Sequence, residues 1–147
     1  MASGASGGAG DDELIGGDAY DFLRGGDGND TLRGNGGGDI HDGGFGSNNL
    51  FGGGGSDELT VKATGNNATN NLLCGNAGDD VLEGSPLAAV NRLNGQGGAD
   101  TLYGDIDEST TTTFRFNLSE DTVYVNDEPI DPNDPFAPQS ELVDCGD

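Results

Sequence analysis

Residues 7–60 decide the fold, and they read GGAGDDELI, GGDAYDFLR, GGDGNDTLR, GNGGGDIHD, GGFGSNNLF and GGGGSDELT. These six nonapeptides follow one another without remainder. Every unit opens with Gly, has Asp or Asn at its sixth position and, except for His41, has Leu at its eighth. A Gly-rich chain with a net charge of −22 would by composition alone indicate disorder. The strict period instead predicts a stack of similar structural units.

The repeat continues beyond residue 60 in a less regular form. Four insertion residues, 61–64, separate the two blocks. The later units begin at Gly65, Gly75, Pro86 and Gly95. The chain is therefore expected to have three parts: an N-terminal arm over 1–6 that is disordered or makes contacts, a repeat domain over 7–103 (regular over 7–60, degenerate over 65–103), and a C-terminal region over 104–147.

The nonapeptide is too short and too poor in apolar residues for a helix, because one Leu in nine positions matches no period of 3.6. Its D-x-Leu-x tail predicts a very short strand, and its Gly-rich head predicts a tight reversal of the chain. Two nonapeptides then make one flattened coil. The coils would stack about 4.8 Å apart through parallel pairing, with Leu residues of both faces meeting in a central seam. The predicted fold is all-β, a parallel β-roll or β-solenoid, and His41 is expected to line its seam.

The sixth positions form two columns in this geometry, because residues separated by two units lie one above another on the same edge of the stack. Asp12 stacks with Asp30, and Asp21 stacks with Asp39. Carboxylates held this close repel each other, and a divalent cation between them would remove the repulsion. Ca²⁺ takes about six to eight oxygen ligands from carboxylates and carbonyls, whereas Mg²⁺ keeps several waters and demands octahedral geometry. The columns therefore favour Ca²⁺ over Mg²⁺.

The nonapeptide resembles G-G-x-G-x-D-x-U-x, with U a large apolar residue, which is the repeat of the RTX (hemolysin-type calcium-binding) proteins. The resemblance covers residues 7–103 and implies a parallel β-roll that is unfolded without Ca²⁺ and ordered by it. It implies ions held by sixth-position side chains and by carbonyls of the Gly-rich heads. It further implies a secreted protein, extracellular or on the cell surface.

The same resemblance carries ligand roles onto particular positions of this sequence. In the regular block these are Asp12, Asp21, Asp30, Asp39 and Asp57, with Asn48 as a weaker neutral member. In the degenerate block they are Asn70, Asp80, Asn91 and Asp100. About four ions are expected in the regular block and about eight at most in all.

The C-terminal region has a different character. Residues 110–118 and 122–126 alternate apolar and polar side chains, which predicts a β-hairpin turning at 119–121. Four Pro residues then enforce an extended arm, expected to cap the last coil or to reach a neighbouring subunit. These are Pro129, Pro132, Pro135 and Pro138. Whether Cys74 and Cys145 form a disulfide that ties this arm to the roll stays open.

Charge and composition restrict the function. Five Lys and Arg against 27 Asp and Glu exclude nucleic acid as a partner, and no apolar run is long enough for membrane insertion. No nucleophile and base are paired in the sequence, so the chain is not expected to be an enzyme. We predict a calcium-binding extracellular structural module. The alternatives are a subunit of a self-assembling, calcium-stabilised filament or adhesin, a homo-oligomer joined through stacked coil ends, and a detached C-terminal secretion module of an RTX enzyme or toxin.

Overall fold

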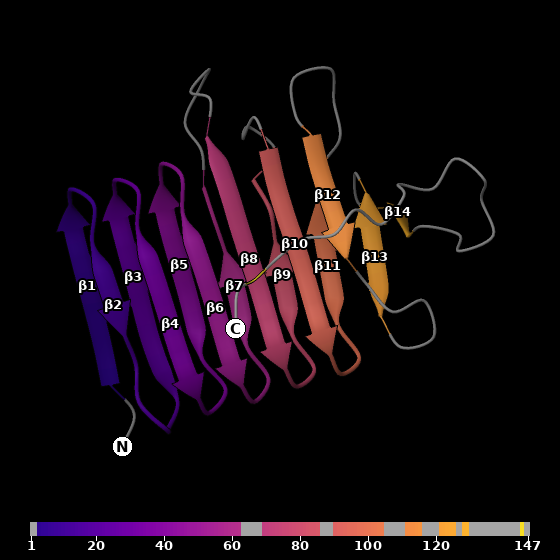
Figure 1. Ribbon diagram of the computed structural model, residues 1–147, viewed down its shortest axis with the longest axis horizontal. Helices are drawn as coiled ribbons and strands as arrows, with labels where there is room; N and C mark the ends of the chain where they lie inside the picture. Colours follow the sequence, from indigo (N-terminus) through magenta and orange to yellow (C-terminus); the bar gives the residue numbers. More distant parts are fainter. Residues whose placement is uncertain are drawn as a thin grey trace.

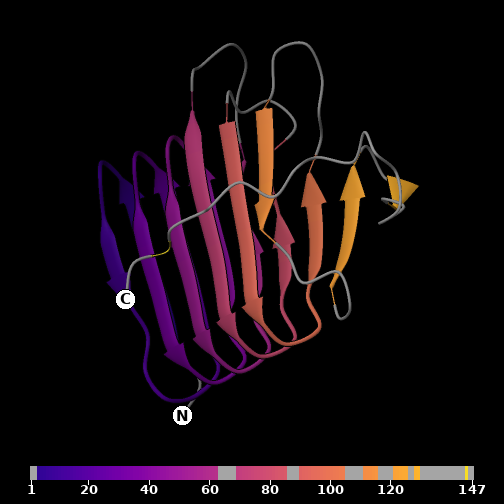
Figure 2. The same ribbon diagram turned by 45° about the vertical axis from the view of Figure 1, so that its right-hand side comes forward.

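The computed structural model describes residues 3–62, 69–85, 90–104, 111–115, 121–125, 128–129 and 145. In these residues the chain winds into two facing sheets of short strands (Figure 1, Figure 2). Neighbouring strands pair in parallel, apart from the last pair of the first sheet. The predicted parallel β-solenoid is confirmed.

Alternate strands along the chain enter opposite sheets. The first sheet runs in the order β1 (Ser3–Ala9), β3 (Asp21–Asp27), β5 (Ile40–Phe45), β7 (Glu58–Thr60), β9 (Val81–Glu83), β11 (Thr101–Gly104), β13 (Thr122–Val125), β14 (Glu128–Pro129). The second sheet runs in the order β12 (Thr111–Arg115), β10 (Val90–Gly97), β8 (Asn70–Ala77), β6 (Asn49–Gly54), β4 (Thr31–Gly36), β2 (Glu13–Ile15). One coil therefore contributes one strand to each sheet.

The register confirms that one coil consists of two nonapeptides in the regular block. Leu14 pairs with Leu32 and then with Leu50 in the second sheet. In the first sheet, Leu23 pairs with His41 and His41 with Leu59. Successive residues of a strand point to opposite faces, so the eighth position of every unit turns inward at the same height as its neighbours.

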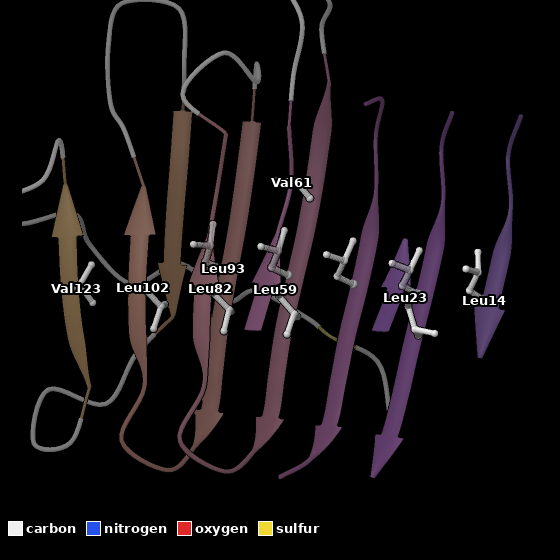
Figure 3. Packing of buried hydrophobic residues seen from close by; sticks show 11 residues of the cluster. Leu14, Leu23, Leu59, Val61, Leu82, Leu93, Leu102 and Val123 are labelled. Carbon is white, nitrogen blue, oxygen red and sulfur yellow. The ribbon is translucent and has the colours of Figure 1, made fainter. Parts of the chain in front are cut away.

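The core is the seam between the two sheets, where the eighth-position side chains meet (Figure 3). Leu32, Leu50 and Leu59 are 0% exposed, and Val123 extends the seam into β13 at 5% exposed. His41 is also 0% exposed, which confirms that it lines the seam. The apolar content of the chain is low, yet nine of the Leu residues that the structure describes are placed in this one layer.

His41 is the weak point of the seam, since neither ring nitrogen has a hydrogen-bond partner. Burial lowers the pKa of this imidazole to about 4, so it stays neutral and unsatisfied. We expect His41→Leu to stabilise the folded chain by about 1–3 kcal/mol, because an unpaired buried polar group is replaced by the residue of its neighbours in register. The measurement is the denaturant midpoint at saturating Ca²⁺. A lower midpoint in the variant would contradict this account of the seam.

The insertion after Thr60 is one residue longer than the sequence indicated. Asn49 pairs with Leu72, and Leu50 with Leu73. The same offset relates Asn48 to Asn71, whose separation along the chain is 23, against 18 for Asp39 and Asp57. Residues 61–65 are thus the insertion, and the next unit starts at residue 66. The next coil is two residues longer than 18, because the Asp80 N–H donates to Asp100 Oδ1 across a separation of 20.

The predicted hairpin of residues 110–118 and 122–126 is wrong. β12 pairs in parallel with β10, and β13 pairs in parallel with β11, so the two strands enter different sheets. Together they add a further coil, which extends the seam through Val123. An alternating pattern reports the faces of a strand but not its neighbour, and here the existing sheets supply the neighbours. A short antiparallel turn-back does occur later, between β13 and β14.

The two ends of the chain also differ from expectation. Residues 3–6, predicted as part of an arm, form the first half of β1, which is exposed over its whole length. Cys74 and Cys145 form a disulfide with Cα atoms 6.0 Å apart, which ties the C-terminal region to β8. The turn at 119–120 and Pro132, Pro135 and Pro138 lie outside the described residues.

None of the described residues form a helix that could cross a lipid bilayer.

Candidate metal centre

The sixth-position side chains gather along two edges of the roll, where the chain passes from one sheet to the other. We call one the acidic edge; it precedes the strands of the first sheet and carries Asp21, Asp39, Asp57, Asp80, Asp100 and Asp121. We call the other the mixed edge; it precedes the strands of the second sheet and carries Asp12, Asp30, Asn48, Asn71 and Asn91. Almost all of these side chains are buried.

On both edges, Oδ1 of the sixth residue accepts a hydrogen bond from the backbone N–H of the sixth residue one coil earlier. On the acidic edge the donor and acceptor pairs are Ser3–Asp21 (3.1 Å), Asp21–Asp39 (2.7 Å), Asp39–Asp57 (2.7 Å), Asp57–Asp80 (2.8 Å), Asp80–Asp100 (2.9 Å) and Asp100–Asp121 (3.1 Å). On the mixed edge they are Asp12–Asp30 (2.9 Å), Asp30–Asn48 (2.8 Å) and Asn48–Asn71 (3.0 Å). Stacked carboxylates are therefore separated by a backbone amide, whereas the sequence indicated that they face each other directly.

The second carboxylate oxygen is the unsatisfied one. Oδ2 of Asp39, Asp57 and Asp80 is buried and has no hydrogen-bond partner, and the same holds for Asp12 and Asp30 on the mixed edge. A buried, ionised carboxylate oxygen without a donor or a cation is costly. Asp21, at the start of the acidic column, differs because its Oδ2 accepts a hydrogen bond from the Gly17 N–H at 2.5 Å.

Each of these unsatisfied oxygens lies over the first Gly of its own unit, and those of Asp30, Asp39 and Asp57 lie beside a carbonyl of the next coil. A Cβ atom placed on Gly34 would meet Asp39 Oδ2 and the Gly52 carbonyl oxygen closer than 3.0 Å. The same two kinds of oxygen crowd a Cβ on Gly52, which would meet Asp57 Oδ2 and the Gly75 carbonyl. Only Gly leaves this space open, and two oxygens of partial or full negative charge border it.

Burial changes the pKa values of these carboxylates. Burial raises the pKa of Asp57 from its ordinary 3.8 to about 6 and that of Asp80 to about 7, although an amide hydrogen bond partly offsets each shift. Burial also raises the pKa values of Asp30 and Asp39. At Asp21, the hydrogen bond from the Ser3 hydroxyl lowers the pKa instead. The raised pKa values show that neighbouring groups of the protein do not compensate the ionised form of these carboxylates.

Asn70 is the one expected ligand that lies outside the columns. Asn70 is exposed, and the buried residue that takes the sixth position is Asn71, because the insertion comprises 61–65. The other expected residues all lie in the two columns. Asp121 was missed: it precedes Thr122-Val123 as Asp precedes x-Leu elsewhere, but no Gly-rich head stands before it. The D-x-U tail alone was the signal that could have found it.

A model of the RTX calcium-binding nonapeptide repeat matches the chain in four copies, over residues 6–40, 42–60, 66–86 and 88–108. The chain belongs to the RTX calcium-binding nonapeptide-repeat family. No curated protein and no solved structure matches the chain. RTX repeats bind Ca²⁺ and are typical of secreted proteins, so this is an RTX calcium-binding β-roll module.

The donor set of this RTX roll fits a hard cation. Carboxylate and carbonyl oxygens are the ligands that Ca²⁺ prefers, and both kinds border the spaces over Gly25, Gly34 and Gly52. Among the described residues no three His, Cys, Asp or Glu side chains converge, so carbonyls must supply much of any coordination shell. Asp39, Asp57 and Asp80, with the carbonyls of Gly52 and Gly75, would hold Ca²⁺ on the acidic edge. The bound ion supplies positive charge where the protein has none.

Proposed function

We propose that this chain is a structural module of the extracellular space whose folding depends on Ca²⁺, and that it has no catalytic activity of its own. The observation that carries the proposal is the row of buried carboxylate oxygens without partners, at Asp39, Asp57 and Asp80. A folded chain with these groups ionised and uncompensated would be unstable. Binding of a cation in the folded state alone would stabilise it by mass action.

Compartment and charge support the same proposal. A chain with a net charge of −22 repels itself when no cation is bound, and metal affinity then becomes folding free energy. The disulfide between Cys74 and Cys145 suits an oxidising environment outside the cytosol. Folding would therefore follow the passage of the chain from low to high Ca²⁺.

Circular dichroism during a Ca²⁺ titration tests this proposal. We expect little β-structure in chelator, a cooperative rise of the β signal as Ca²⁺ is added, and a much weaker response to Mg²⁺ at equal ionic strength. The Mg²⁺ arm controls for simple screening of the negative charge. An unchanged β spectrum in chelator would overturn the proposal.

A second candidate is a calcium-stabilised filament subunit, which the exposed edge of β1 favours. Within the described residues, β1 pairs only with β3, so its other side presents unpaired backbone groups that could accept a strand of a second copy. Such head-to-tail stacking does not close and would produce filaments. Light scattering after addition of Ca²⁺ distinguishes the two, since a monodisperse monomer at high protein concentration would eliminate the filament.

A further inference from the structure

Both edges of the roll link successive coils through the sixth-position side chain, but part of the mixed edge uses Asn where the acidic edge uses Asp. Both use Oδ1 of the sixth residue to accept a backbone N–H from the coil before, a task that Asp and Asn perform equally well. Where the mixed edge carries Asn, its side chain differs from Asp only in the second atom. In Asp that atom is an anionic oxygen that needs a donor or a cation, and in Asn it is an N–H₂ group that needs an acceptor.

Beyond Asp30, the mixed edge satisfies its amide groups from within the protein. Asn48 Nδ2 donates to the Gly44 carbonyl at 3.4 Å. Asn71 Nδ2 donates to Asn91 Oδ1 at 3.2 Å, and Asn91 Nδ2 donates to the Ser85 carbonyl at 2.7 Å. These side chains are 0% to 1% exposed, so the hydrogen bonds form in a buried setting where they count most.

The atoms around the first Gly of a unit also differ between the two edges. The three atoms nearest to a Cβ on Gly43 would be carbons of Val61, Leu50 and Asn48. At the corresponding Gly52 of the acidic edge, the nearest atoms are Asp57 Oδ2 and the Gly75 carbonyl oxygen. The insertion after Thr60 thus places an apolar side chain, Val61, where the acidic edge has oxygen.

The heads of the later mixed-edge units lead to the same conclusion. The residues before Asn71 read NNAT over 66–69, and those before Asn91 read PLAA over 86–89. The acidic edge keeps Gly at the first position in all of its repeat units, with heads such as GNAG over 75–78 and GQGG over 95–98. At Asn71 and Asn91 the amide side chain therefore coincides with the loss of Gly from most of the head, whereas the unit of Asn48 keeps the head GGFG over 43–46.

We propose that this roll takes up Ca²⁺ unequally, along the acidic edge and at the Asp12–Asp30 end of the mixed edge, while Asn48, Asn71 and Asn91 hold the remainder of the mixed edge together without metal. The inference rests on the proposed calcium dependence and adds which residues respond to the ion. The acidic edge then responds to Ca²⁺, whereas the part of the mixed edge that carries Asn48, Asn71 and Asn91 is a scaffold whose sixth-position side chains bear no charge.

Matched substitutions on the two edges test this distribution. Asp57→Asn should lower the Ca²⁺ bound at saturation by about one ion per chain and reduce the stabilisation that Ca²⁺ gives. Asn48→Asp should add no ion and should lower stability in Ca²⁺ and in chelator alike, because it buries a carboxylate beside Val61 and Leu50. Bound Ca²⁺ is counted by equilibrium dialysis with elemental analysis, and stability by denaturant unfolding.

Asn48→Ala is a second test of the mixed edge, which remains usable if Asn48→Asp does not fold. It removes the amide without adding charge, so the count of bound ions should stay at the wild-type value. A lower count in Asn48→Ala, or more or tighter Ca²⁺ binding in Asn48→Asp, would overturn the unequal distribution. Wild-type protein that binds no Ca²⁺ would instead remove the proposed function itself, so the two failures are distinguishable.

Discussion

Gly52→Ala is expected to abolish both folding and Ca²⁺ binding, whereas Gly54→Ala, two residues later on the same strand, should leave both intact. A Cβ on Gly52 would stand where Asp57 Oδ2 lies and at 2.7 Å from the Gly75 carbonyl oxygen. The carboxylate can rotate away, but the carbonyl belongs to the backbone of the next coil and cannot. We expect a loss of about 3 kcal/mol or more in the free energy of unfolding, at the upper end of overpacking costs.

Gly54 provides the matched control. A Cβ there would meet only the Asn35 carbonyl oxygen at 3.8 Å, which is ordinary contact. Neither Gly52 nor Gly54 has a positive φ, so the two substitutions differ in available space and not in backbone strain. Gly→Ala at a compatible position usually stabilises by about 0.4–1 kcal/mol through the unfolded state. Circular dichroism at saturating Ca²⁺ is the measurement, and a Gly52→Ala chain that folds like wild type would show that this space is not needed.

The repeat alone was enough to predict the architecture, because the Leu of each unit must be buried and only a two-sided coil of two nonapeptides buries all of them. Leu14, Leu32 and Leu50 lie in register as their spacing requires. The sixth-position columns followed from the same spacing. The sequence could not show that the two oxygens of one carboxylate have different roles. In Asp57, Oδ1 accepts a backbone N–H, whereas Oδ2 has no hydrogen-bond partner.

The wrong predictions concern segments whose sequence fits two registers of the repeat, or fits none. Asn70-Asn71-Leu72-Leu73 satisfies the N-x-Leu pattern both from Asn70 and from Asn71, and only pairing with β6 selects the second. Residues 111–115 and 122–125 have clear strand patterns, but no Gly-rich heads show that they continue the coil. Their partners are set by the open sides of β10 and β11, which a local pattern does not contain.

Acidification should have opposite effects on the metal-free and the Ca²⁺-loaded protein. In chelator, the folded state takes up protons that the unfolded state does not, because burial raises the pKa of Asp57 to about 6 and that of Asp80 to about 7. A raised folded pKa gives stability that is fully present below the unfolded value of 3.8 and is lost as pH rises through about 6 to 7. The metal-free chain should therefore gain β-structure between pH 8 and pH 5.

Two other groups modify this window. His41 has a folded pKa of about 4 against an ordinary 6.5, so its contribution is lost as pH falls through that range and opposes the gain. The His41→Leu variant removes this opposing titration and should show the acid-induced gain more strongly. The nearby carboxylates of Asp39, Asp79 and Asp100 add repulsion that protonation also relieves.

With Ca²⁺ bound, the sign reverses. A carboxylate must lose its proton to hold a metal ion, so protons compete with Ca²⁺ and the apparent affinity should fall as pH drops from 8 to 5. The β signal in circular dichroism, followed across this range in chelator and at a fixed subsaturating Ca²⁺ concentration, should therefore move in opposite directions. Signals that fall together with acid would mean that the buried carboxylates are not the groups that Ca²⁺ neutralises, and signals that rise in parallel would mean that protons and Ca²⁺ act at separate places.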